Sequence, residues 1–90
     1  MTRERTARIE SLLTSSFAPT KILVKDQSHL HAGHAGAEDG RGHFAVTIVS
    51  EQFAGQSRIA RHRMIFHALG EMMQTDIHAL SIKALTADEA

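Results

Sequence analysis

The segment from Phe53 to Leu69 constrains the fold most, because it contains a turn, a helix start and the longest stripe of apolar residues at helical spacing. Gly55 indicates a turn, and the Ser57 hydroxyl can accept a hydrogen bond from a backbone N–H as an N-cap. The stripe that follows consists of Ile59, Phe66, Leu69 and Met73. We therefore predict a helix from about Ser57 to Gln74 with this stripe buried.

His62 falls inside the same stripe when successive residues are placed about 100° apart around the helix. We therefore expect His62 to pack and hydrogen-bond in the core rather than to bind a ligand. The opposite side of the helix is predicted to carry Ala60, Met64, His67 and Glu71.

The rest of the chain supplies a second long helix and three strands. A helix is predicted from Thr2 to about Phe17, with Ile9, Leu12, Leu13 and Phe17 on one face. Pro19 cannot continue it. Alternation of apolar and polar residues predicts strands at 21–26, 43–49 and 77–85, the first two antiparallel. Their inward residues are predicted to be Ile22, Val24, Phe44, Val46, Ile48, Leu80 and Ile82.

Thr86 and Glu89 have the spacing of a capping box, which predicts a final helical turn. The order is then α-β-β-α-β-α, an α+β fold in which helices cover one face of a three-stranded sheet. Ninety residues are enough for one core, so residues 1–90 are predicted to form a single domain.

Composition excludes several classes of protein. Ten basic and ten acidic residues cancel, so no global field attracts nucleic acid or an acidic membrane. Without Cys the chain has no disulfide and no thiolate ligand, and a soft-metal site must take its sulfur from a partner. No catalytic constellation is recognisable, which indicates a protein that is not an enzyme. The charged N-terminal segment and the lack of an apolar span favour a cytoplasmic location.

Residues 29–42 contain four Gly and no apolar period, so we expect a mobile loop. His29, His31 and His34 lie within it and His43 stands at its exit. Imidazole is the commonest metal ligand, and the spacing leaves two alternatives open, a zinc site or an exposed polar loop. His78, at the start of the last strand, is by itself more typical of a structural residue.

Two motifs resemble the BolA family, in its bacterial, His-type form. Phe53 to Leu69 matches the pattern Phe-x-Gly-x-Ser-x-x-x-Arg-His-Arg, and Ile77-His-Ala-Leu80 matches a second motif. The similarity extends over roughly residues 5–88. It implies a fold similar to the class II KH domain.

The resemblance also implies a function. BolA proteins pair with monothiol glutaredoxins and share a bridging [2Fe-2S] cluster, to which the partner brings its Cys and a glutathione thiol. His78 matches the ligand of the His-Ala-Leu motif, and the Asp-x-Ser-x-x-His pattern starting at Asp26 selects His31, with His34 as runner-up. We expect a monomer without a cluster in isolation and a heterodimer with glutaredoxin, acting in iron–sulfur cluster handling or iron sensing.

Two other functions stay open. Some BolA proteins are stress-related transcriptional regulators with a helix-turn-helix-like element, and Arg58, Arg61 and Arg63 on the central helix could contact DNA. Alternatively, the protein is an interaction module that docks through an apolar patch of Ala60, Met64 and Ala68.

Overall fold

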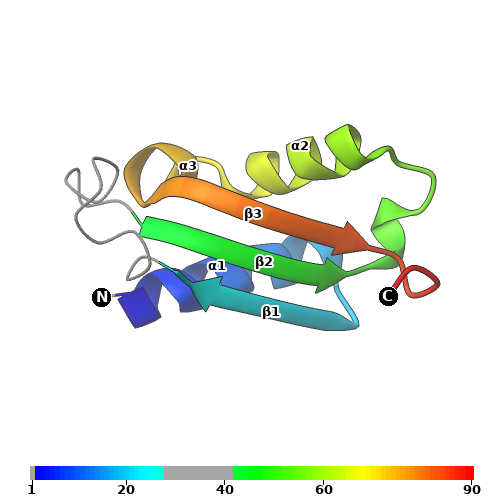
Figure 1. Cartoon of the computed structure of the whole chain (residues 1–90), viewed down its shortest axis with the longest axis horizontal. Coiled ribbons are helices and arrows are strands. Elements are labelled where there is room, and N and C mark those ends of the chain that lie inside the picture. Colours follow the sequence, from blue (N-terminus) through cyan, green and yellow to red (C-terminus); the bar gives the residue numbers. More distant parts are fainter. Residues whose placement is uncertain (1, 28–41) are drawn as a thin grey trace.

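The computed structural model describes residues 2–27 and 42–90, where helices cover one face of a three-stranded sheet (Figure 1). The elements in chain order are α1 (Thr2–Phe17), β1 (Lys21–Asp26), β2 (Gly42–Val49), the 3-10 turn η3 (Glu51–Phe53), α2 (Arg58–Leu69), α3 (Met72–Thr75) and β3 (Ile77–Leu85). The sheet order is β1-β2-β3, with β1 antiparallel and β3 parallel to β2. The predicted α+β fold is confirmed.

Helix α1 has the predicted bounds and buries the predicted face, with Ile9, Leu13 and Phe17 in the core. It ends because Ala18 adopts a left-handed conformation (φ 44°) and donates its N–H to the Thr14 carbonyl at 3.0 Å. Pro19 follows at once and prevents another helical turn.

Strand β2 forms the centre of the sheet. Its inward residues Phe44, Val46 and Ile48 are buried as predicted, and the same face of the sheet carries Val24 and the half-buried Ile82. In register, Val46 lies opposite both Val24 and Ile82, so one row of branched side chains crosses all three strands.

The central helix differs from the prediction in length. It stops at Leu69 because Gly70 has a positive φ of 55° and donates its N–H to the Phe66 carbonyl. A separate short helix, α3, follows. The predicted N-cap is confirmed, since the Ser57 hydroxyl accepts the Ala60 N–H at 3.1 Å.

The predicted buried face of α2 is wrong for two of its residues, since Ile59 is 64% exposed and Phe66 is 40% exposed. Leu69 is buried as predicted, but its buried neighbour on the helix is Ile65, which was not part of the predicted stripe. Helix α2 contacts both α1 and β3, and these two contacts select a face rotated away from the predicted stripe.

The same rotation overturns the proposed docking patch. Met64 and Ala68 pack against the core instead of facing outward. Met72 of α3 completes the buried row.

No helix follows β3 in the described chain, so the predicted final helix is wrong. The capping-box contact does form, because the Thr86 N–H donates to Glu89 Oε1 at 2.8 Å. However, the next N–H, of Ala87, donates to Glu51 Oε2 at 3.0 Å, and the segment closes as a turn.

The predicted loop 29–42 lies outside the described residues, except for Gly42, which begins β2. Within 2–27 and 42–90, no helix is both long enough and apolar enough to cross a membrane.

Candidate functional site

Two histidines meet at one end of the sheet. His43 of β2 and His78 of β3 have ring centroids 5.2 Å apart, with the ring planes inclined at 49°. His43 is half-buried, whereas His78 is exposed. The sequence placed His43 only at the exit of a loop, and the structure adds it to the candidate site.

A change of register brings the two rings together. Gly42 pairs with Ile77, but His43 pairs with Ala79, so His78 is the extra residue of a β-bulge. A bulge bends the strand and redirects the side chain at the extra position. The parallel pairing of β2 with β3 thus places both imidazoles at the same strand ends.

Polar contacts fix the backbone just before His78 in the chain. Asp76 accepts a hydrogen bond from Arg5 Nε at 3.2 Å, and its carbonyl accepts the Gly42 N–H at 2.9 Å. The Thr75 hydroxyl and Arg5 hold the pKa of Asp76 below its ordinary value, so this carboxylate stays charged and ties α1 to the start of β3. The first core residue of the strand, Ile77, is buried.

The His-rich segment departs from this end of the sheet. The described chain stops at Gln27, whose N–H donates to the His43 carbonyl at 2.7 Å, and resumes at Gly42. The predicted ligands His31 and His34 lie outside the described residues. The described chain therefore stops and resumes next to the His43–His78 pair.

Two imidazoles are a partial ligand set. Neutral imidazole suits zinc and iron, and paired His residues hold one iron of a Rieske [2Fe-2S] centre. Within the described residues, no group of three or more His, Cys, Asp or Glu side chains could hold a metal ion. The donor types fit a cluster whose remaining ligands come from elsewhere.

His62 does not lie in the core as predicted. It is half-buried and lines a cleft between the start of α2 and the end of β3. Its side chain has no hydrogen bond to another described residue. The rotation of α2 that exposes Ile59 also moves His62 away from the core.

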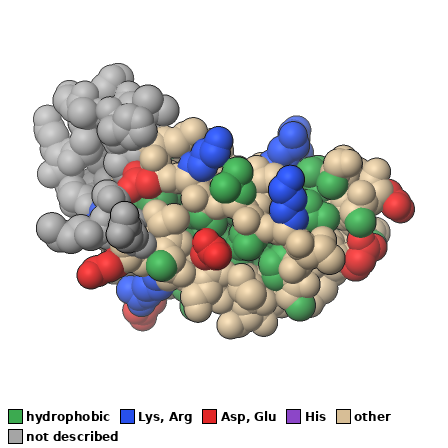
Figure 2. Space-filling view, turned by 90° about the horizontal axis from the view of Figure 1, so that it is seen from below, with side chains coloured by type: hydrophobic (Ala, Val, Ile, Leu, Met, Phe, Trp, Pro, Cys, Tyr) green, Lys and Arg blue, Asp and Glu red, His purple; other side chains and the backbone are tan. Residues whose placement is uncertain are grey.

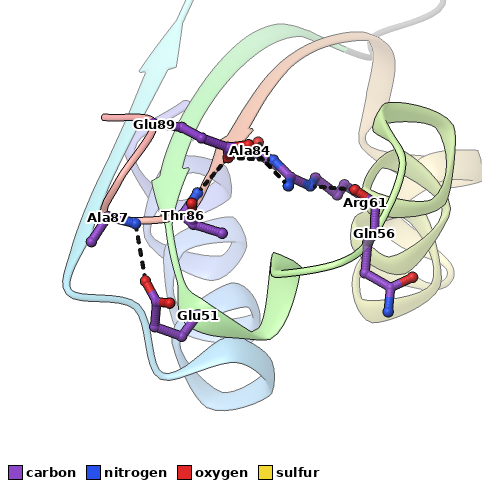
Figure 3. A network of polar contacts seen from close by, with 7 residues as sticks. All are labelled: Glu51, Gln56, Arg61, Ala84, Thr86, Ala87 and Glu89. Carbon is purple, nitrogen blue, oxygen red and sulfur yellow. Dashed lines mark hydrogen bonds and ion pairs between the residues drawn. The ribbon is translucent and has the colours of Figure 1, made fainter.

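Of the three arginines on the predicted basic helix, one makes contacts within the fold. Arg58 and Arg63 are exposed, but Arg61 is half-buried and donates to Glu89, to the Gln56 carbonyl and to the Ala84 carbonyl (Figure 3). Figure 2 views the molecule from the side of α1 and β1, away from α2, and the Lys and Arg side chains on that face lie among Asp and Glu side chains.

Most of this chain matches one protein family. The model of the BolA-like protein family matches residues 13–89. Protein BOLA1, chloroplastic, from Arabidopsis thaliana is 39% identical over 89 residues, which cover 96% of this chain and 56% of the relative, so the chain spans little more than half of that protein.

A bacterial relative and a solved structure extend the comparison. The DNA-binding transcriptional regulator BolA of Escherichia coli (strain K12) is 40% identical over 82 residues, covering 91% of this chain and 75% of the relative. The BolA domain of SufE1 from Arabidopsis thaliana superposes with a TM-score of 0.85 at 39% identity, covering 96% of this chain and 95% of that one. These relatives are named as regulators or BolA proteins rather than as enzymes. The chain therefore belongs to the BolA-like protein family.

Proposed function

We propose that this protein binds a monothiol glutaredoxin and shares a bridging [2Fe-2S] cluster with it, in iron–sulfur cluster handling or iron sensing. The observation that supports this proposal best is the exposed His78, placed on a bulge against His43 at the end of the sheet where the His-rich segment attaches. The chain has no Cys, so its share of a ligand set consists of imidazoles. The glutaredoxin Cys and a glutathione thiol supply the two thiolates.

In this proposal His78 is one ligand and His31 is the second, with His34 as its substitute. His43 packs against His78 and limits the orientations that its ring can adopt. Outer contacts of this kind orient a ligand and tune a metal centre. Its proximity also makes His43 the third candidate for the second ligand.

The test is co-expression with a monothiol glutaredoxin, followed by visible absorption spectroscopy and native mass measurement. We expect a coloured heterodimer that contains glutathione and two irons, and an isolated protein without colour. His78→Ala should abolish the cluster spectrum or alter it strongly, while protein–protein binding remains measurable. A colourless wild-type heterodimer, or a stoichiometric cluster in the isolated protein, would refute the proposal.

Single replacements then identify the second ligand. His31→Ala should shift the visible spectrum and make the cluster more labile, whereas His34→Ala should be nearly silent. His67→Ala is the matched control, because His67 is exposed on α2. If His43→Ala alone reproduces the shift, the second ligand is His43.

Direct DNA binding is a second candidate, favoured by the name of the Escherichia coli relative and by an α2 segment that contains three Arg and no acidic residue. It predicts that the isolated protein binds duplex DNA with a steep dependence on salt. Replacing both Arg58 and Arg63 by Gln should reduce the slope of log K against log[salt] by about 2, since each phosphate contact contributes about 0.9. Binding that does not depend on salt would argue against this function.

A further inference from the structure

A cleft of about 390 Å³ lies between the start of α2 and the end of β3. Arg58 and Arg61 of α2, Lys83 of β3 and Glu89 of the C-terminal turn line this cleft. Figure 3 shows the Glu89 carboxylate reaching the Arg61 guanidinium. His78 and Ala84 are six positions apart along β3, which is roughly 20 Å at 3.3 Å per residue. The cleft is therefore separate from the histidine pair.

Two backbone carbonyls fix the Arg61 guanidinium independently of its contact with Glu89. Its Nε donates to the Gln56 carbonyl at 3.0 Å and its Nη1 donates to the Ala84 carbonyl at 3.0 Å. The Arg61 side chain is only 12% exposed. Because two backbone carbonyls fix its orientation, the guanidinium is preorganised for a ligand.

Glu89 occupies this guanidinium in the manner of a bound carboxylate. Nη1 donates to Oε1 at 2.6 Å and Nη2 donates to Oε2 at 3.2 Å, a bidentate pairing. The Thr86 N–H donates to the same Oε1 at 2.8 Å. The cleft thus contains a complete carboxylate site, filled by a side chain of the protein itself.

Positive charge exceeds negative charge in the cleft. Among the described residues, the side chains of Arg58 and Lys83 have no hydrogen-bond or ion-pair partner. Three cationic side chains therefore line a cleft that contains one carboxylate, although the chain as a whole has a net charge of zero. A ligand with several carboxylates would find two further cations beside Arg61.

The turn that supplies Glu89 is held by few contacts. Residues 87–90 are exposed, and the Glu89 side chain itself is 44% exposed. Apart from Glu89, the turn is tied to the body by the Ala87 N–H on Glu51 and by the buried Thr86. Segments with so few buried contacts open at low cost in free energy.

We propose that this cleft is a docking site for an acidic segment of a partner protein, and that the turn of residues 86–90 occludes it. A carboxylate of the partner replaces Glu89 on Arg61, and neighbouring carboxylates pair with Arg58 and Lys83. The resident ligand argues for a carboxylate, because the guanidinium fork and one backbone N–H converge on the two oxygens of Glu89. Opening of the turn is the regulatory step.

The test is a titration with a fluorescein-labelled acetyl-Glu-Ala-Glu-Ala-Glu amide peptide, followed by fluorescence anisotropy at low ionic strength. If the turn is closed nine-tenths of the time or more, Glu89→Gln should tighten binding about tenfold or more, because the competent state becomes fully populated. Glu10→Gln is the matched control, since it removes the same charge from an exposed position on α1.

Two further variants separate docking from a general effect of charge. In the Glu89→Gln background, replacing both Arg58 and Lys83 by Gln should weaken binding roughly fivefold, as expected for two exposed ion pairs. Glu51→Ala should also tighten binding, because it releases the Ala87 N–H and loosens the turn. Circular dichroism checks that each variant is folded.

Three results would overturn the proposal. The first is a Glu89→Gln protein that binds the peptide no better than Glu10→Gln does. The second is equal binding of a control peptide in which every Glu is replaced by Gln. The third is displacement of the peptide by inorganic phosphate at concentrations where acetate has no effect, which would assign the cleft to phosphate.

Discussion

Replacing Ile65 and Ile59 by Ala makes the same chemical change at two positions of α2 with opposite surroundings. Ile65 is fully buried, whereas Ile59 is 64% exposed. Each replacement removes three carbon groups. Where these groups are buried, their removal costs about 2.4 kcal/mol, at about 0.8 kcal/mol per group. At Ile65 the unfilled cavity adds to this loss, and we expect a decrease of about 3 kcal/mol in the free energy of unfolding.

At Ile59 little area is withdrawn from water on folding, and Ala is the better helix former. The change in stability should therefore stay within about 0.5 kcal/mol in either direction. For a domain of this size, 1 kcal/mol shifts the melting temperature by about 4–8 °C. Ile65→Ala should thus lower the melting temperature by about 12–24 °C, and Ile59→Ala by a few degrees at most.

Far-UV circular dichroism in heat and in urea measures both variants, because the chain has no Trp or Tyr for intrinsic fluorescence. The urea midpoint should move while the m value stays constant, which would show that stability rather than the unfolded state has changed. Equal losses at the two positions, or a larger loss at Ile59, would refute the assignment of the buried face of α2.

Two further predictions follow from polar contacts. Ser50→Ala should lower the free energy of unfolding, measured in urea, by about 1–3 kcal/mol. The buried Ser50 hydroxyl donates to the Phe17 carbonyl at 2.7 Å, and its removal leaves that carbonyl without this hydrogen bond. An unchanged free energy of unfolding would contradict the contact. Hydrogen bonds from Arg61 and the Thr86 N–H lower the pKa of Glu89 from 4.5 to about 2. The stability advantage of the wild type over Glu89→Gln should therefore be complete above about pH 4.5 and vanish as the pH falls toward 2, which acid titration of both proteins can measure.

Local pattern was sufficient for most element bounds. Alternation of apolar residues placed β1 and β3 at their observed ends, and Pro19 marked the end of α1. The Ser57 N-cap was recognisable because its contact spans three residues. Signals of this kind depend on neighbours within one helical turn or one strand, so the sequence carries them directly.

The family and the role of His78 as a candidate ligand could also be predicted from the sequence, through two motifs. The contact of His78 with His43 could not be predicted from the sequence. His43 and His78 are 35 positions apart in the numbering and meet only because β3 runs parallel to β2 with a bulge at His78, opposite Gly42 and His43. Neither the parallel pairing nor the bulge is visible in the spacing of residues along one strand.

The buried face of α2 was likewise decided by tertiary structure. This helix carries apolar residues on several sides, including Ile59, Met64, Ile65 and Phe66, so periodicity offers more than one face. Contacts with α1 and β3 select the face of Ile65 and leave Ile59 in solvent. Glu89 makes the local contact with the Thr86 N–H that the sequence predicted, but its pairing with Arg61, 28 residues away in sequence, depends on the packed chain. Local preferences define which segments become helices and strands, but only the packed chain determines which of their side chains meet.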